Sequence, residues 1–179
     1  KPGKCQFFAS AVNYLGMGIS DKGIYIEDHR KTAIQEWPVP DTPSSTLRSR
    51  AKAGRKTRNR DGKTGIRSFL GVVGFFRKFI RGYSQKARAL TDLLKAEQEF
   101  YWGEEQQRSF DELKAAILSS EVLQIPSSDP KHEIVLYPDA SKVAVGAVFL
   151  QDQGQGFRPC AYISKRLNEK QASWGPYEM

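Results

Sequence analysis

LYPDASKVAVGAVF, residues 136–149, places a single acidic residue, Asp139, inside an apolar and β-branched pattern. The runs on either side of Ser141 predict two strands that are joined by a short turn. A carboxylate on a buried strand is costly unless it is paired or binds a metal ion. Asp139 is therefore either a strand-end carboxylate that bonds to nearby backbone groups or one part of a functional site.

The segments around this strand pair predict a chain that mixes helices and strands. A third β-rich run follows the pair and completes an antiparallel meander. Upstream, apolar residues recur at helical spacing. In chain order, the expected elements are short strands within 6–26, a short helix that Asp28 caps and Pro38 ends, helices within 66–84, 85–97 and 104–120, and strands at 132–140, 143–152 and 157–167.

Composition indicates a globular protein of one ordinary domain or two small ones, because the 179 residues are 39% hydrophobic and 27% charged. The apolar runs are much shorter than the roughly 20 residues of a membrane span, and the first residues lack the order of a signal peptide. Cys5 and Cys160 match no metal-binding spacing. We therefore expect reduced thiols in an intracellular protein, in the cytoplasm or the nucleus.

The net charge of +8 is concentrated in one tract. Between Arg48 and Arg67 there are nine Lys or Arg and one Asp, a surplus that equals the net charge of the whole chain. The tract is either a nucleic-acid-binding arm or a disordered, solvated loop. Its glycines and its lack of apolar periodicity argue against order. Since long surface insertions cost little loop entropy, we expect the neighbouring helices to fold without residues Ser49–Ile66.

Several segments in a fixed order carry a further signal. They are NYLGMGISDKGI (13–24), AIQEWPVP (33–40), IRSFLGVVGFFRKFIRGYS (66–84), LTDLLK (90–95), FYWGEEQQRSFDELKAAILSSEVLQIPSSDP (100–130), LYPDASKVAVGAVFLQ (136–151) and RPCAYISKRLNEKQASWGPYE (158–178). In this order, the segments resemble the pol polyprotein of gypsy-like long-terminal-repeat retroelements. The resemblance covers nearly all of the chain outside the basic tract, and ordered blocks are far more specific than a single motif.

The resemblance implies an α+β fold with a reverse transcriptase part and the start of an RNase H-like part. Residues 1–40 would be the end of the palm, with a hairpin like the one that grips the primer strand. Residues 41–66 would be a linker with a basic insertion, and residues 67–129 the helical thumb and connection. Residues 130–179 would be a truncated RNase H-like domain with an incomplete β-meander.

The resemblance also assigns Asp139 to the set of four carboxylates that hold two divalent metal ions, Mg²⁺ in this family. The other three carboxylates have no counterpart in the sequence, so we expect no stable metal binding and no activity of this fragment alone. The family usually has Thr in place of Pro138. Proline in a central strand removes a ladder hydrogen bond, so we expect the strand to bend there or the position to have drifted.

The parent activity that the resemblance implies is RNA-directed DNA synthesis together with RNase H cleavage. We expect this chain to retain non-specific binding of an RNA–DNA hybrid or DNA, to act with the rest of the pol polyprotein and to have no membrane partner. The alternatives are a solvated helix face at the thumb positions and, for the whole chain, a non-catalytic interaction protein derived from a retroelement. The implied contact residues are Tyr14 and Gly16 in the hairpin and Arg67, Arg77, Lys78 and Arg81 on the thumb.

Overall fold

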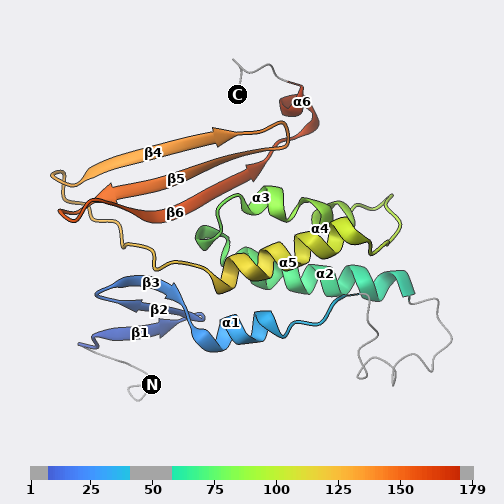
Figure 1. The fold of residues 1–179 in the computed structure, drawn as a ribbon, viewed down its shortest axis with the longest axis horizontal. Helices are drawn as coiled ribbons and strands as arrows, with labels where there is room; N and C mark the ends of the chain where they lie inside the picture. Colours follow the sequence, from blue (N-terminus) through green and yellow to red (C-terminus); the bar gives the residue numbers. More distant parts are fainter. Residues whose placement is uncertain (1–7, 41–57, 174–179) are drawn as a thin grey trace.

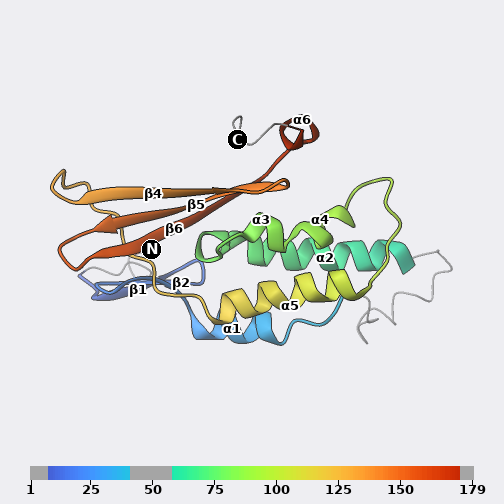
Figure 2. The same cartoon turned by 45° about the horizontal axis from the view of Figure 1, so that its top comes forward.

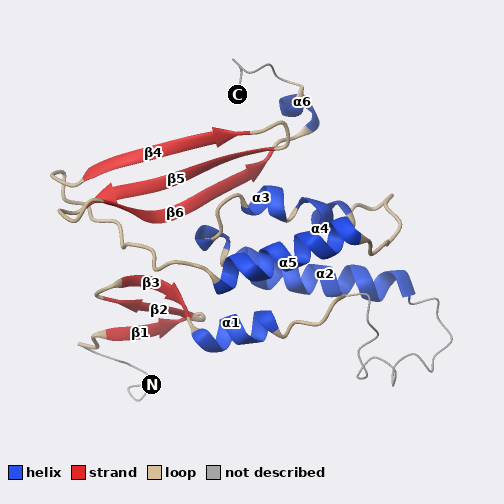
Figure 3. Ribbon diagram, viewed as in Figure 1, coloured by secondary structure: helices blue, strands red, loops and turns tan. Residues whose placement is uncertain are grey.

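The computed structural model describes residues 8–40 and 58–173 and has the α+β architecture that the sequence predicts. It contains two three-stranded antiparallel sheets and a group of helices (Figures 1 and 3). The elements are β1 (Ala11–Tyr14), β2 (Met17–Ser20), β3 (Gly23–Ile26), α1 (Asp28–Gln35), α2 (Arg58–Phe75), η2 (Arg77–Phe79), α3 (Tyr83–Lys86), α4 (Arg88–Asp92), α5 (Glu104–Leu118), β4 (Glu133–Ala140), β5 (Ala144–Asp152), β6 (Phe157–Arg166) and α6 (Glu169–Ala172).

The helices α2 to α5 lie on one side of the sheet β4–β5–β6, and α1 runs along their opposite side (Figures 1 and 2). The sheet β1–β2–β3 lies beside the ends of these helices, below the other sheet in the view of Figure 1. Apolar residues at helical spacing on α2 and α5 face one another, and the rings of Phe69 and Phe110 are 4.4 Å apart. None of the helices in the described part of the chain has the length and apolar character that a membrane span requires. The fully buried members of this core include Ile66, Phe69, Val73, Leu90, Leu113 and Ile117.

The N-terminal sheet needs glycine at two positions where another group lies too close for a side chain. Gly18 pairs with Tyr25 across β2 and β3, and a Cβ at Gly18 would lie 2.2 Å from the Tyr25 ring. Gly23 has a φ of +127°, and a Cβ there would lie 2.2 Å from the carbonyl oxygen of Leu123. The missing side chain of Gly23 lets Leu123 exchange two backbone hydrogen bonds with Ile24, at 2.7 and 2.8 Å. A segment 100 residues downstream is thereby attached to this sheet.

Helix α2 begins at Arg58, so the last part of the expected linker is helical. Gly62 is buried against Phe100, and the Nζ of Lys63 donates to the carbonyls of Lys95 and Gln98 at 2.9 and 2.5 Å. Ile66 is fully buried in the core. The expectation that Ser49–Ile66 can be removed without loss of stability is therefore wrong. Residues 41–57 lie outside the described part of the chain, and for them the choice between an arm and a loop stays open.

The sheet β4–β5–β6 is the expected meander, with β4 at its edge in the described structure. The backbone N–H of Ser141 donates to the carbonyl of Ala144 at 2.9 Å, and bonded pairs alternate with non-bonded pairs along an antiparallel ladder. Pro138, which is opposite Ala147, therefore falls in a non-bonded pair. Its missing N–H points to the free edge and removes no bond to β5. The expected loss of a ladder bond is therefore not seen between β4 and β5, the strands that pair here.

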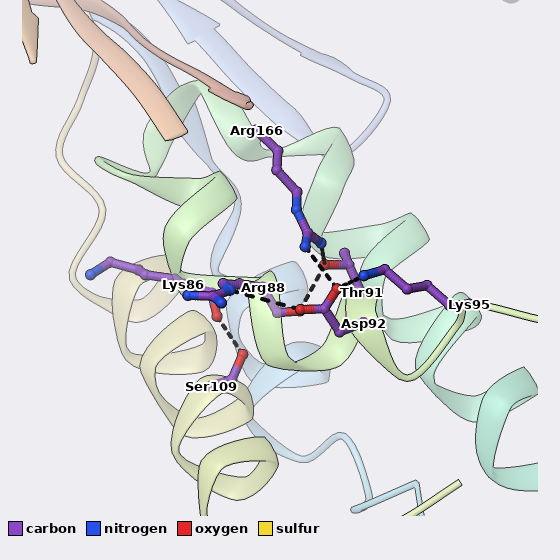
Figure 4. A network of polar contacts seen from close by, with 7 residues as sticks. All are labelled: Lys86, Arg88, Thr91, Asp92, Lys95, Ser109 and Arg166. Carbon is purple, nitrogen blue, oxygen red and sulfur yellow. Dashed lines mark hydrogen bonds and ion pairs between the residues drawn. The ribbon is translucent and has the colours of Figure 1, made fainter. Parts of the chain in front are cut away.

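Polar contacts attach β6 to the helices. The hydroxyl of Ser164 accepts from the backbone N–H of Ser84 at 2.9 Å. Three cationic side chains converge on Asp92, at 2.8 Å from Arg166, 3.0 Å from Lys95 and 3.8 Å from Arg88 (Figure 4). Burial alone would raise the pKa of Asp92, but the hydrogen bonds and charges of Lys95 and Arg166 outweigh it and hold the pKa below 3.8. We call Asp92 and Arg166 the clasp.

We predict that Ile66→Ala lowers the free energy of unfolding by about 2–5 kcal/mol, because it leaves a cavity at a fully buried position. Urea denaturation would measure the change. Ser68→Ala, at an exposed position on the same helix, is the matched control and should change stability by about 0.5 kcal/mol or less. Equal effects of the two substitutions would show that the first turns of α2 are not part of the core.

We predict that Asp92→Asn weakens the clasp and lowers stability at neutral pH by about 1 kcal/mol, since the pairs are partly exposed. A carboxyl with a lowered folded-state pKa stabilises above the unfolded pKa, and that stability is lost as the pH falls through the folded value. At a pH below that lowered folded value, the variant and the parent chain should therefore have the same stability. Denaturation at both pH values, with Asp21→Asn in an exposed turn as the control, tests this; a deficit that persists at low pH would contradict it.

Candidate nucleic-acid interface

A groove of about 480 Å³ separates the helices from the C-terminal sheet. Its helical wall carries Arg81 and Lys86, from the segments around α3, and its sheet wall carries Tyr137 and Asp139. The groove thus brings together two residues that the sequence singled out separately, Arg81 and Asp139. It lies on the same side of the sheet as the contacts that hold β6 to the helices.

The alternation of side chains along the strands explains why these residues share one face. Tyr137 pairs with Val148, which pairs with Tyr162, and directly paired residues point to the same side of a sheet. Tyr162 packs against the helical core, so this row faces the helices. The next row joins Asp139, Gly146 and Ser164, and Ser164 bonds to α3. The outward face instead carries exposed apolar side chains, Ile134, Leu136 and Ile163.

Asp139 is exposed at the sheet edge, which corrects the expectation of a carboxylate on a buried strand. In the described residues, no three His, Cys, Asp or Glu side chains come together in a way that could hold a metal ion. A pair of catalytic metal ions needs several carboxylates. The residues present around Asp139 therefore do not fit the magnesium site that the resemblance implies. The only acid that lines the groove besides Asp139 is Glu121, among the residues described.

The four basic residues that the resemblance assigns to the thumb lie in different surroundings. Arg77 and Arg81 are exposed, and Arg81 is close enough to Tyr162 that its charge opposes the rise in the pKa of Tyr162 that burial and Glu121 cause. Lys78 is half-buried, with its Nζ 5.4 Å from the centre of the Phe79 ring, and burial lowers its pKa. Arg67 is exposed on α2 and does not line the groove.

The hairpin residues form a second region on the other sheet. Tyr14 is 59% exposed, and the turn after it has positive φ at Leu15 and Gly16. The side chain of Arg30, on α1, lies across Gly16, where a Cβ would be 2.6 Å from its Nε. An exposed aromatic ring can stack on a base, and a guanidinium group that lies across the following turn can contact a phosphate.

Sequence reasoning missed Arg30, Lys86 and Tyr137 as candidates. Arg30 and Lys86 lie on short helices and belong to no sequence motif, and only their positions against Gly16 and in the groove distinguish them. Tyr137 could have been found, because it is two residues from Asp139 on a predicted strand and must share its face.

Residues 102–179 match the family described as the RNase H-like domain found in reverse transcriptase. Over 172 residues the chain is 31% identical to the retrovirus-related Pol polyprotein from transposon 412 of Drosophila melanogaster, with 96% of this chain and 12% of the relative covered. It is 32% identical over 171 residues to the Gag-Pol polyprotein of Gibbon ape leukemia virus, with 96% of this chain and 9% of the relative covered. The chain thus spans about a tenth of these relatives.

Solved structures of a foamy viral protease-reverse transcriptase share the fold. In complex with an RNA/DNA hybrid, that protein matches 98% of this chain with a TM-score of 0.73 and 21% identity, over 21% of its own length. In complex with dsDNA, it matches 95% of this chain with a TM-score of 0.69 and 23% identity, over 31% of its length. The family match and the Pol relatives identify the chain as one of retroelement pol origin, and its residues 102–179 belong to the RNase H-like domain family found in reverse transcriptase.

Proposed function

We propose that this chain binds a nucleic-acid duplex, without sequence preference, as part of a pol polyprotein. The observation that carries the proposal is the groove in which Arg81 and Lys86 face the sheet, with exposed Arg77 close by along the chain. Cations on a rigid surface neutralise backbone phosphates whatever the base sequence. The foamy viral relatives in fold were solved with dsDNA and with an RNA/DNA hybrid, which supports a duplex as the ligand.

The hairpin with Tyr14, Gly16 and Arg30 is a second contact in this proposal, with the ring of Tyr14 available to the primer strand. The polyprotein would carry out RNA-directed DNA synthesis and RNase H cleavage, and this family is generally dependent on divalent metal ions. The chain described here would contribute binding and positioning. An intracellular location, in the cytoplasm or nucleus, is part of the same proposal, because its nucleic-acid partner is there.

We predict that Arg77→Ala with Arg81→Ala weakens binding to an RNA–DNA hybrid and reduces the slope of log affinity against log salt by about two units, close to one for each lost phosphate contact. Fluorescence anisotropy at several salt concentrations would measure both quantities. Arg108→Ala removes the same type of charge from an exposed position on α5, outside the groove, and is the control. A salt slope that Arg77 and Arg81 do not affect would overturn the proposed contact.

We also predict that the chain does not cleave an RNA–DNA hybrid with Mg²⁺ or Mn²⁺, because Asp139 alone cannot organise two metal ions. Gel analysis of labelled RNA after incubation with either metal would measure cleavage. Asp139→Asn is the control for contaminating nuclease. Metal-dependent cleavage by the parent chain that disappears in Asp139→Asn would contradict the prediction.

A protein partner is the second candidate, and the outward face of the C-terminal sheet favours it. Ile134, Leu136 and Ile163 are 60%, 55% and 51% exposed on that face. Contiguous exposed apolar side chains are typical of surfaces that another protein covers. The partner in this candidate function is another part of the polyprotein. Binding that is tight and insensitive to salt would support this candidate, whereas binding that falls steeply with salt supports the nucleic-acid interface.

A further inference from the structure

The sheet side of the groove has a space at Gly146, which we call the floor, and the proposed duplex contacts do not use this space. In the row Asp139–Gly146–Ser164, the middle position has no side chain, and Gly146 lines the groove. A Cβ at Gly146 would lie 3.4 Å from the carbonyl oxygen of Ile163 and 3.9 Å from that of Asp139, which are ordinary contacts. Gly146 is therefore not required by packing within the chain, and its effect is to leave space beside Asp139.

The row next to this opening presents aromatic surface. Tyr137 and Tyr162 flank Val148 on the same face, and Tyr137 is 58% exposed. Tyr162 is held by its packing against the helical core. An exposed ring on a rigid strand, next to an open floor position, is a platform on which a planar heterocycle can stack.

The two walls of the groove differ in charge. Arg81 and Lys86 supply cations from the helical side, and Asp139 supplies a carboxylate from the sheet side. A ligand that satisfies both walls needs an anionic group at one end and a hydrogen-bond donor at the other. The volume of about 480 Å³ is within the range of small-molecule sites.

We propose that the groove binds one nucleoside monophosphate unit whose base carries an exocyclic amino group. The phosphate lies against Arg81 and Lys86, the base stacks on Tyr137 above Gly146, and the amino group donates to Asp139. No bond is made or broken. The unit is either a free nucleotide or the terminal nucleotide of a strand. The inference rests on the proposed nucleic-acid binding at this groove and adds to it a pocket for a single nucleotide.

The test is titration of the ¹⁵N-labelled chain with adenosine monophosphate, followed by NMR. Amide shifts should change around Arg81, Tyr137 and Gly146 at concentrations up to about 5 mM, where even a millimolar Kd is visible. Inorganic phosphate and adenosine should each bind more weakly, because each supplies half of the contacts. Inosine monophosphate, which lacks the amino group, should bind about five-fold more weakly if Asp139 accepts from it.

Substitutions that change shape but not charge distinguish binding in the pocket from non-specific electrostatic attraction. Gly146→Val fills the floor without loss of charge and should abolish the shifts, and Tyr137→Leu should weaken binding about ten-fold. Ala161→Val adds bulk to the outward face of β6 and should leave binding unchanged. Melting of each variant verifies its fold. Unchanged binding in Gly146→Val, if it is folded, or no shifts with the parent chain, would overturn the pocket.

Binding of duplexes distinguishes a free nucleotide from the terminal nucleotide of a strand. It also distinguishes the nucleotide pocket from the proposed duplex contact. A hairpin duplex with one unpaired adenosine at its end should bind more tightly than a blunt hairpin if a strand terminus fills the pocket, and equally if only free nucleotides do. If adenosine monophosphate does not bind but Arg81→Ala still weakens blunt-duplex binding, the pocket is wrong and the proposed function stands. If the nucleotide binds but duplex binding ignores Arg77 and Arg81, the proposed duplex contact is wrong.

Discussion

The attachment of one extended dipeptide, Leu123-Gln124, to both sheets is the constraint on which the rest of the structure depends. Leu123 exchanges two backbone hydrogen bonds with Ile24 on β3, and the N–H of Gln124 donates to the carbonyl of Pro159 on β6 at 2.8 Å. Both residues are buried, and buried backbone groups must be paired. The Gln124 side chain adds a bond to the carbonyl of Gln151 at 3.0 Å. The dipeptide thereby fixes one sheet relative to the other.

One wall of the groove is the C-terminal sheet, and contacts at several points along β6 hold this sheet in place. The dipeptide attaches to β6 near its start, Ser164 bonds to α3, and the clasp between Arg166 and Asp92 holds the end of β6 (Figure 4). The clasp consists of partly exposed charged groups, so it is the attachment most sensitive to salt and pH. The groove width therefore depends on backbone hydrogen bonds at one end of β6 and on electrostatics at the other.

Local patterns predicted the elements but not the contacts between them. Alternation identified the three strands of the C-terminal sheet, and helical spacing identified the core face of α2 and α5. The first part of α2 was missed because charges and glycines hide its signal, although Gly62 and Ile66 are buried. Gly23 follows the turn between β2 and β3, and it also leaves room for the backbone of Leu123. The contact that requires a glycine here comes from a residue 100 positions away, which no local sequence pattern contains.

Local sequence also predicted the wrong environment for Asp139. An apolar strand sequence suggested burial, and burial made the carboxylate seem to need a partner. The strand is instead an exposed edge in the described sheet, so Asp139 keeps its contact with water and the desolvation cost does not arise. Its place opposite Arg81 and Lys86 then matters more than its position in the sequence motif. An acid that remains in water on a groove wall is suited to accept a hydrogen bond from a ligand, which is a different role from holding metal ions.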